Sequence, residues 1–187
     1  PDYLQFLLTG VKKQEYTNAT STQLVSPKTN DWDYELIEQL GYNKKMFQPI
    51  SLPGTVVGNF TKEIQDEILD SLKPGWIAGL SLLGGEPFEP ENQKPLLDFV
   101  KRFKAQYPNK TIWCYSGFTL EEITGKLPSR AYTEISAELL RQMDVLVDGR
   151  YEKALKNISL KFRGSENQRV IDVQKTLAQK KIILYLN

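Results

Sequence analysis

The chain has 187 residues, of which 40% are hydrophobic and 25% are charged, so its composition is that of a soluble globular protein rather than a disordered one. Its net charge of +1 predicts no attraction to nucleic acid or to an anionic membrane, and no run approaches the ~18 apolar residues of a membrane span. A single cysteine excludes an internal disulfide and predicts a cytoplasmic protein, and the lack of histidine removes the commonest metal ligand.

The first part of the chain carries few signals of regular structure. A helix over residues 3–8 is expected to stop at Gly10. Asp33 is placed to cap a second short helix, which Gly41 ends. Between these elements, residues 12–30 are polar and rich in Thr, Ser and Asn. A segment with so few apolar residues is not expected to fold alone, because its burial does not offset the conformational entropy that ordering costs.

From about Phe60 onward, the hydrophobic periodicity alternates between that of helices and that of strands. The predicted elements, in chain order, are a helix between Thr61 and Pro74, a strand over 77–83, a helix around 96–103, a strand over 111–115, a helix that begins at Thr119, a helix around 135–143, a strand over 145–147 and a strand over 181–186. Thr119 and Glu122 have the spacing of a capping box. Such alternation is typical of βα units, so this part is predicted to be α/β with a parallel sheet.

The turn Gly84-Gly85-Glu86-Pro87 closes the apolar run of the first predicted strand. Two glycines allow backbone N–H groups to approach a carboxylate, and the Glu86 side chain is suited to an ammonium group. The pattern therefore indicates a site for the amino acid end of a ligand. An ordinary turn between a strand and a helix is the alternative interpretation of the same four residues.

Two further candidate positions follow the later strands. Ser116 comes after the strand over 111–115, and Asp148 and Arg150 come at the end of the strand over 145–147. Ligands of parallel α/β sheets bind at the carboxyl ends of strands, which favours a shared site. Simple turns explain these positions as well. The polar segment 163–169 is open to the same two interpretations, a functional loop or a solvated basic one.

Cys114 lies in the middle of a predicted strand, between Trp113 and Tyr115. In such a position a lone cysteine behaves as a small buried hydrophobe. One thiolate cannot hold a four-iron cluster, so the sequence predicts no metal ligand and no catalytic residue.

Three phrases in the later part of the chain carry a family resemblance. Gly79 to Pro87, Asp144 to Gly149 and Leu160 to Arg169 resemble, in order and spacing, the activating protein of anaerobic ribonucleoside-triphosphate reductase, a radical S-adenosylmethionine (SAM) enzyme. The resemblance covers roughly residues 60–187 and implies an incomplete (β/α) barrel. It also implies SAM and a [4Fe-4S] cluster as cofactors and the reductase large subunit as partner, which would receive a glycyl radical. The residues implied to bind the cofactor are Gly84, Gly85, Glu86, Pro87, Ser116, Asp148 and Arg150.

One feature of that family is missing from this chain. In the family, a Cys-x3-Cys-x2-Cys loop ahead of the first helix holds the cluster, and the open iron site of the cluster chelates SAM. No such loop is present here. The resemblance therefore predicts an activating protein by descent that is inactive as written. A non-catalytic binding remnant, with a docking or SAM-binding surface, is the alternative.

The residues before about Phe60 resemble a different family. Pro1 to Gly10, Glu15 to Leu24, Trp32-Asp33 and Pro53 to Gly58 are similar to an internal piece of rhamnulokinase, a sugar kinase of the FGGY family. The implied organisation is a small, mostly helical or irregular kinase fragment over 1–59, followed by an activase-like domain over 60–187 that lacks its first strand. The join is expected within residues 60–67. A carbohydrate kinase is the third candidate function, although the segments for its chemistry lie outside the retained piece.

Overall fold

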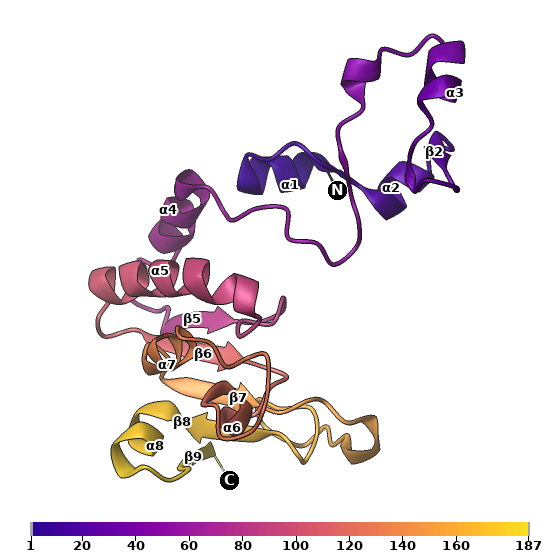
Figure 1. Ribbon diagram of the computed structural model, residues 1–187. Helices are drawn as coiled ribbons and strands as arrows, with labels where there is room; N and C mark the ends of the chain where they lie inside the picture. Colours follow the sequence, from indigo (N-terminus) through magenta and orange to yellow (C-terminus); the bar gives the residue numbers. More distant parts are fainter. Residues whose placement is uncertain (1, 187) are drawn as a thin grey trace. The chain divides into compact units, whose positions relative to one another are not determined.

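The computed structural model describes residues 2–186 and divides the chain into two compact units, Pro1–Ile68 and Leu69–Asn187 (Figure 1). The division falls inside helix α4 (Lys62–Ser71). Each unit has its own buried cluster of apolar side chains. The boundary predicted between residues 59 and 60 separates segments of different family origin rather than compact units, and it stays a prediction.

The first unit is built from short elements. They are α1 (Asp2–Thr9), β1 (Gln14–Glu15), α2 (Tyr16–Thr20), β2 (Val25–Ser26), β3 (Asp31–Trp32), α3 (Tyr34–Gln39), η1 (Lys44–Met46) and β4 (Ile50–Ser51). Strand β1 pairs with β4 in parallel, and β2 pairs with β3 in antiparallel orientation. Each ladder has only two residues per strand, so turns and short helices make up most of the unit.

Both predicted helix signals of this unit are confirmed. Helix α1 ends where the Gly10 amide donates to the Phe6 carbonyl at 2.7 Å, with Gly10 at a φ of +71°. The Asp33 carboxylate accepts from the Leu36 amide at 3.0 Å and so caps α3. The short helix α2 is missing from the sequence interpretation. Its N-cap is Glu15. Glutamate is not among the residues that helices prefer at the N-cap, which are Ser, Thr, Asp and Asn, so the sequence carries no capping signal for this helix.

The core of the first unit is small. Ala19, Trp32 and Ile37 are its buried apolar residues, and the Trp32 ring lies 4.9 Å from the Phe47 ring. The indole Nε1 of Trp32 donates to the Gln48 carbonyl at 2.8 Å, which satisfies the polar atom of a nearly buried ring. Three buried side chains are a modest core for 68 residues. That this segment does not fold alone stays a prediction.

The second unit is a five-stranded sheet with helices. Its elements are β5 (Gly79–Leu82), α5 (Pro90–Gln106), β6 (Thr111–Tyr115), α6 (Leu120–Ile123), α7 (Ser136–Arg141), β7 (Val145–Asp148), η2 (Lys153–Leu155), β8 (Arg169–Asp172), α8 (Val173–Gln179) and β9 (Leu184–Leu186). The strand order is β5-β6-β7-β8-β9. The predicted parallel arrangement is confirmed for β5, β6 and β7, whereas β8 runs antiparallel to β7 and β9 runs antiparallel to β8. The described residues therefore form an α/β unit with an open, mixed sheet.

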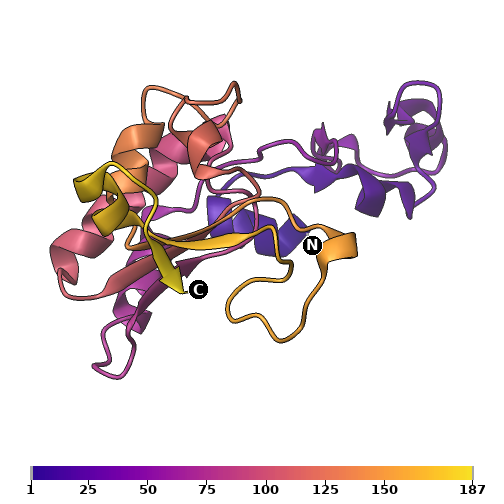
Figure 2. The same cartoon turned by 90° about the horizontal axis from the view of Figure 1, so that it is seen from below.

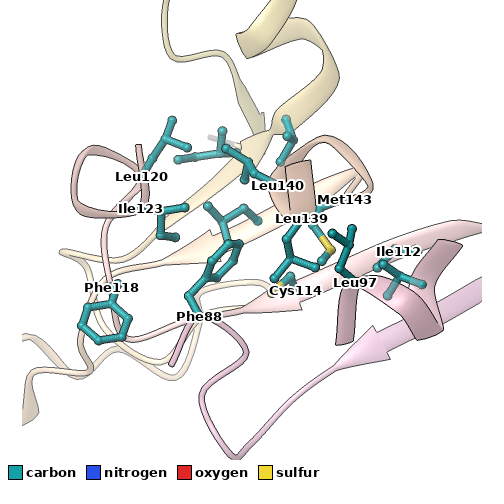
Figure 3. Close-up of a cluster of buried hydrophobic side chains, with 14 of the residues drawn as sticks. Phe88, Leu97, Ile112, Cys114, Phe118, Leu120, Ile123, Leu139, Leu140 and Met143 are labelled. Carbon is teal, nitrogen blue, oxygen red and sulfur yellow. The ribbon is translucent and has the colours of Figure 1, made fainter. Parts of the chain in front are cut away.

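The helices cover one face of this sheet (Figure 2). Ile112 and Cys114 of β6 lie in the main core, where they meet apolar side chains of α5 and α7 (Figure 3). Leu146 of β7 belongs to the same buried cluster. Cys114 is fully buried, as predicted. Burial raises the pKa of its thiol, and the Glu86 carboxylate raises it further, so this cysteine stays protonated and unreactive at neutral pH.

The opposite face of the sheet is partly covered by the loop over residues 149–168. Val145, Val147 and Val170 form a second buried cluster on this face, together with Trp113. The Trp113 ring lies 4.9 Å from the ring of Phe162, which belongs to the loop. The loop is thereby held against the sheet near the carboxyl ends of the parallel strands.

Candidate functional site

A cleft of about 300 Å³ opens at the carboxyl ends of the three parallel strands. It is lined by Leu83, Gly84, Glu86, Tyr115, Ser116, Gly117, Val147, Gly149, Tyr151 and Gln168. The residues come from the last positions of β6 and β7, from the segments that follow β5, β6 and β7, and from the loop that precedes β8. This is the edge at which open α/β sheets bind their ligands.

The turn after β5 has an unusual backbone. Gly84, Gly85 and Glu86 have φ values of +81°, +63° and +47°, so three successive residues lie in the left-handed region. Glycine adopts this conformation freely, but a residue with a side chain is destabilised by about 1–2 kcal/mol. The strain at Glu86 must therefore be offset by interactions of its side chain.

The Glu86 carboxylate joins the β5 turn to the β6 turn. Its Oε1 accepts from the Ser116 hydroxyl at 2.7 Å and from the Phe88 amide at 3.2 Å, and its Oε2 accepts from the Gly117 amide at 2.8 Å. A carboxylate offers about four acceptor positions, so one remains open beside the cleft. Among residues 2–186, no hydrogen bond uses the backbone amides of Gly84 or Gly85.

Ser116 holds this arrangement together. Its hydroxyl donates to Glu86 and accepts from the Phe118 amide at 3.0 Å, while its own amide donates to the Val147 carbonyl at 2.9 Å. The side chain is buried, and both functions of its hydroxyl are used. Ser116 therefore positions Glu86 rather than offering a free donor to a ligand.

Asp148 is fully buried, and its neighbours in the chain, Val147 and Gly149, line the cleft. Its carboxylate accepts from the Leu120 amide at 2.7 Å and from the Arg169 Nε at 2.9 Å. The same guanidinium group binds Glu121 through two nitrogens, at 3.1 and 2.7 Å. Asp148 and Glu121 raise the pKa of Arg169, and Arg169 in turn lowers the pKa of Glu121. These three ion-paired side chains connect α6, the end of β7 and the start of β8.

Gln168 organises the loop on the other side of the cleft. Its amide nitrogen donates to the Gly149 carbonyl at 2.9 Å, and its oxygen accepts from the Gly164 amide at 2.9 Å. Arg150 is exposed, and its carbonyl accepts from the Asn167 side chain at 2.7 Å. The loop is thus fixed by amide side chains at both of its ends.

The ligands for an iron-sulfur cluster are not present in this arrangement. Residues 2–186 contain no group of three or more His, Cys, Asp or Glu side chains that could hold a metal ion. The one cysteine is buried in the core with a raised pKa. The residues present therefore do not fit a [4Fe-4S] cluster, which needs several accessible thiolates.

Comparison with known families gives two matches along the chain. Residues 42–171 match the 4Fe-4S single cluster domain, and residues 1–71 match the N-terminal domain of the FGGY family of carbohydrate kinases. The anaerobic ribonucleoside-triphosphate reductase-activating protein of Pasteurella multocida is 38% identical over 130 residues, which are 68% of this chain and 74% of that protein. The chain belongs to this activating-protein family. No solved structure matches it.

Other relatives confirm that the chain is a fusion of two families. The activating protein of Enterobacteria phage T4 is 36% identical over 111 residues, which are 59% of this chain and 64% of the phage protein. The rhamnulokinase of Oceanobacillus iheyensis is 59% identical over 68 residues, but these make up 36% of this chain and only 14% of the kinase. The chain thus spans less than two thirds of these two relatives. No described helix is long and apolar enough to cross a membrane.

The fold brings only some of the predicted site residues to the cleft. Gly84, Glu86 and Ser116 line it, and Gly85 and Pro87 belong to the same turn without lining it. Asp148 and Arg150 flank the lining residue Gly149. Whether any of the seven residues binds a cofactor stays a prediction.

Gly117 and Gly149 line the cleft beside predicted site residues. Gly117 follows Ser116 at the strand end that the sequence already favours for ligands, and Gly149 follows Asp148. Other lining residues were not among the predicted site residues. Tyr115 and Val147 were assigned only to strands. Tyr151 carries no local signal, because its place in the cleft depends on the path of the loop over the sheet.

Proposed function

We propose that the second unit of this activating-protein chain retains a weak site for the amino acid end of SAM, and that the chain as it stands carries out no radical chemistry. The observation that carries the proposal is the open acceptor position on Glu86 beside the unused amides of Gly84 and Gly85. An α-amino acid presents an ammonium group next to a carboxylate. The turn offers the complementary pair, an acceptor for the first and two donors for the second.

The rest of the activating machinery is proposed from the family alone. The cofactors would be SAM and a [4Fe-4S] cluster, the partner would be the large subunit of an anaerobic ribonucleotide reductase, and the protein would act in the cytoplasm. In this proposal the sheet is part of an incomplete barrel, because β5 is an end strand that pairs only with β6 among the described residues. No reaction step is assigned, because residues 2–186 offer no ligand set for the cluster.

The expected affinity follows from the number of contacts. A net contribution of about 0.5–1.5 kcal/mol for each of two or three hydrogen bonds gives at most about 4.5 kcal/mol. Micromolar binding needs about 8 kcal/mol, and millimolar binding about 4 kcal/mol. We therefore expect calorimetry to detect no SAM binding at micromolar concentration, and binding at millimolar concentration at best.

This proposal is tested by a titration followed by NMR. Adding SAM or methionine at millimolar concentration should shift the amide signals of Gly84, Gly85 and Gly117. Glu86→Gln should abolish the shifts, because it removes the charge that attracts the ammonium group and places an amide nitrogen beside donors. Glu91→Gln, which makes the same charge change on exposed α5, is the matched control. Equal shifts in wild type and Glu86→Gln would show that the turn does not bind the amino acid end.

A carbohydrate kinase is the alternative that the first unit suggests, and we expect it to fail. Phosphoryl transfer needs placed phosphates, a metal ion and a base, and the retained piece corresponds to only 14% of a rhamnulokinase. Purified protein should show no rhamnulose-dependent ATP turnover in a coupled assay. A full-length rhamnulokinase in the same assay is the positive control. Sugar-dependent turnover that co-purifies with the chain would contradict this expectation.

A further inference from the structure

A second cavity, of about 340 Å³, lies between α6 and α8 of the second unit. It shares no lining residue with the cleft at the strand ends. The α6 side contributes Leu120, Glu121 and Lys126, and the segment at the end of α8 contributes its other lysines. The cavity is therefore a separate feature that the proposed SAM site leaves unexplained.

The rim of this cavity is positively charged. Lys126, Lys180 and Lys181 line it, and none of the three has an ion-pair partner among residues 2–186. Lys180 ends α8 in the left-handed conformation, with a φ of +54°, and the chain reverses there. Three like charges around one cavity repel one another, so an anion placed among them is favoured.

The one carboxylate of the lining does not neutralise these lysines. Glu121 is bound by the Arg169 guanidinium through two hydrogen bonds, which lowers its pKa and keeps it charged. Arg169 is shared with the buried Asp148. One guanidinium thus serves two carboxylates, which leaves a single net negative charge, and Lys126 also lowers the pKa of Glu121. Three ammonium groups at the rim therefore outnumber the negative charge that faces them.

The interior of the cavity is mainly apolar. Leu120, Leu177 and Ile182 line it, and Leu120 is almost completely buried. The hydroxyl of Thr124 already donates to the Leu120 carbonyl at 2.7 Å. Thr176 exchanges hydrogen bonds with the backbone of residue 183. A ligand would therefore find apolar surface inside and charged donors at the entrance.

We propose that this cavity binds a small organic phosphate, with an apolar body on Leu120, Leu177 and Ile182 and the phosphate among the three lysines. A phosphate monoester carries a charge of about −1.5 to −2 at neutral pH and three acceptor oxygens, which suits three ammonium groups better than a carboxylate does. A volume of about 340 Å³ lies within the range of pockets that hold small ligands.

The proposal is tested with naphthyl phosphate, a fluorescent phosphate monoester with an apolar body. The full chain should bind it saturably, with a dissociation constant of about 1 mM or tighter. Naphthol and inorganic phosphate should each bind about tenfold more weakly, because each offers only one half of the interaction. Rising salt concentration should weaken binding of the ester, since the attraction is electrostatic.

Variants locate the site. The triple change Lys126→Gln, Lys180→Gln and Lys181→Gln should weaken binding at least about tenfold. The matched control changes three exposed lysines of the loop over 149–168, at positions 153, 156 and 161, to Gln and should leave binding unchanged. Leu177→Gln, at a partly exposed position, should weaken binding of the ester while leaving binding of inorganic phosphate unchanged.

Three results would overturn the proposal. The first is a lack of saturable binding at millimolar ester. The second is an equal loss of binding in the two triple variants, which would mean a nonspecific response to net charge. The third is equal affinity for the ester and for inorganic phosphate, which would mean that the apolar interior plays no part. As a control, circular dichroism should show that every variant keeps the fold of the wild-type chain. The failure of SAM binding would leave this test unaffected, because the cavities are lined by different residues.

Discussion

Replacing residues 1–59 by the first strand and the Cys-x3-Cys-x2-Cys loop that the family resemblance implies, taken from an activating protein, should convert a colourless chain into one that assembles an iron-sulfur cluster. The expected result is visible charge-transfer absorption after anaerobic reconstitution, together with reductive cleavage of SAM and radical transfer to the reductase. We expect this result because residues 2–186 offer no ligand set for the cluster, whereas the hydrogen bonds that hold Glu86 in its turn are in place. Absorption spectra and SAM cleavage products measure the two steps separately.

Two controls make this graft decisive. The same graft with its three cysteines changed to serine should remain colourless. The graft that carries Glu86→Gln should assemble the cluster but lose SAM affinity. If the unmodified graft assembles a cluster and still fails to cleave SAM, the downstream site is degraded as well. The assignment of Glu86 would then lose its basis.

Replacing Arg169 by methionine should destabilise the second unit by about 3–5 kcal/mol, the usual effect of leaving a buried charge unpaired. Asp148 is fully buried, and Arg169 is its ionic partner among the described residues. The same guanidinium also holds Glu121. The measurement is urea unfolding of wild type and Arg169→Met at pH 7, followed by circular dichroism.

A second variant separates the buried charge from lost packing. Asp148→Asn added to Arg169→Met should recover part of the stability, because it removes the unpaired charge while an amide oxygen can still accept from the Leu120 amide. Lys175→Met breaks the ion pair between Lys175 and Asp172, in which the lysine is largely exposed, and should cost far less. Equal stabilities of Arg169→Met and of the double variant Arg169→Met with Asp148→Asn would contradict this account.

The pH dependence of stability gives a further check of the same ion pairs. Arg169 lowers the pKa of Glu121 in the folded state, so this pair contributes stability above the pKa of the unfolded glutamate, about 4.3. That contribution should disappear as pH falls through the lower folded pKa. In the Glu121→Gln variant, this part of the acid destabilisation should be missing.

Local patterns in the sequence predicted several local features of this protein, although α2, β8 and α8 carried no signal that was recognised. The capping box at Thr119 and Glu122 is present, with the Thr119 hydroxyl accepting from the Glu122 amide and the Glu122 carboxylate accepting from the Thr119 amide. The Gly10 and Asp33 signals mark the helix ends that they predict, and Cys114 is buried. Each of these features depends on hydrogen bonds or apolar spacing within a few residues. The family phrases likewise lie in short segments, so the fusion of two families was readable from the sequence.

Only the tertiary structure decided the later part of the sheet and the state of the candidate site. The strand β8 is four residues long, and its antiparallel pairing with β7 depends on a twenty-residue loop that carries no strand signal. Arg169, which is 21 positions from Asp148 in the sequence, forms a buried ion pair with that residue, and no pattern in the sequence indicates this pairing. In the same way, the Ser116 hydroxyl donates its hydrogen to the carboxylate of Glu86, which lies 30 positions earlier in the sequence. Such contacts depend on how distant strands are brought side by side, and hydrophobic periodicity does not encode which charged groups then meet.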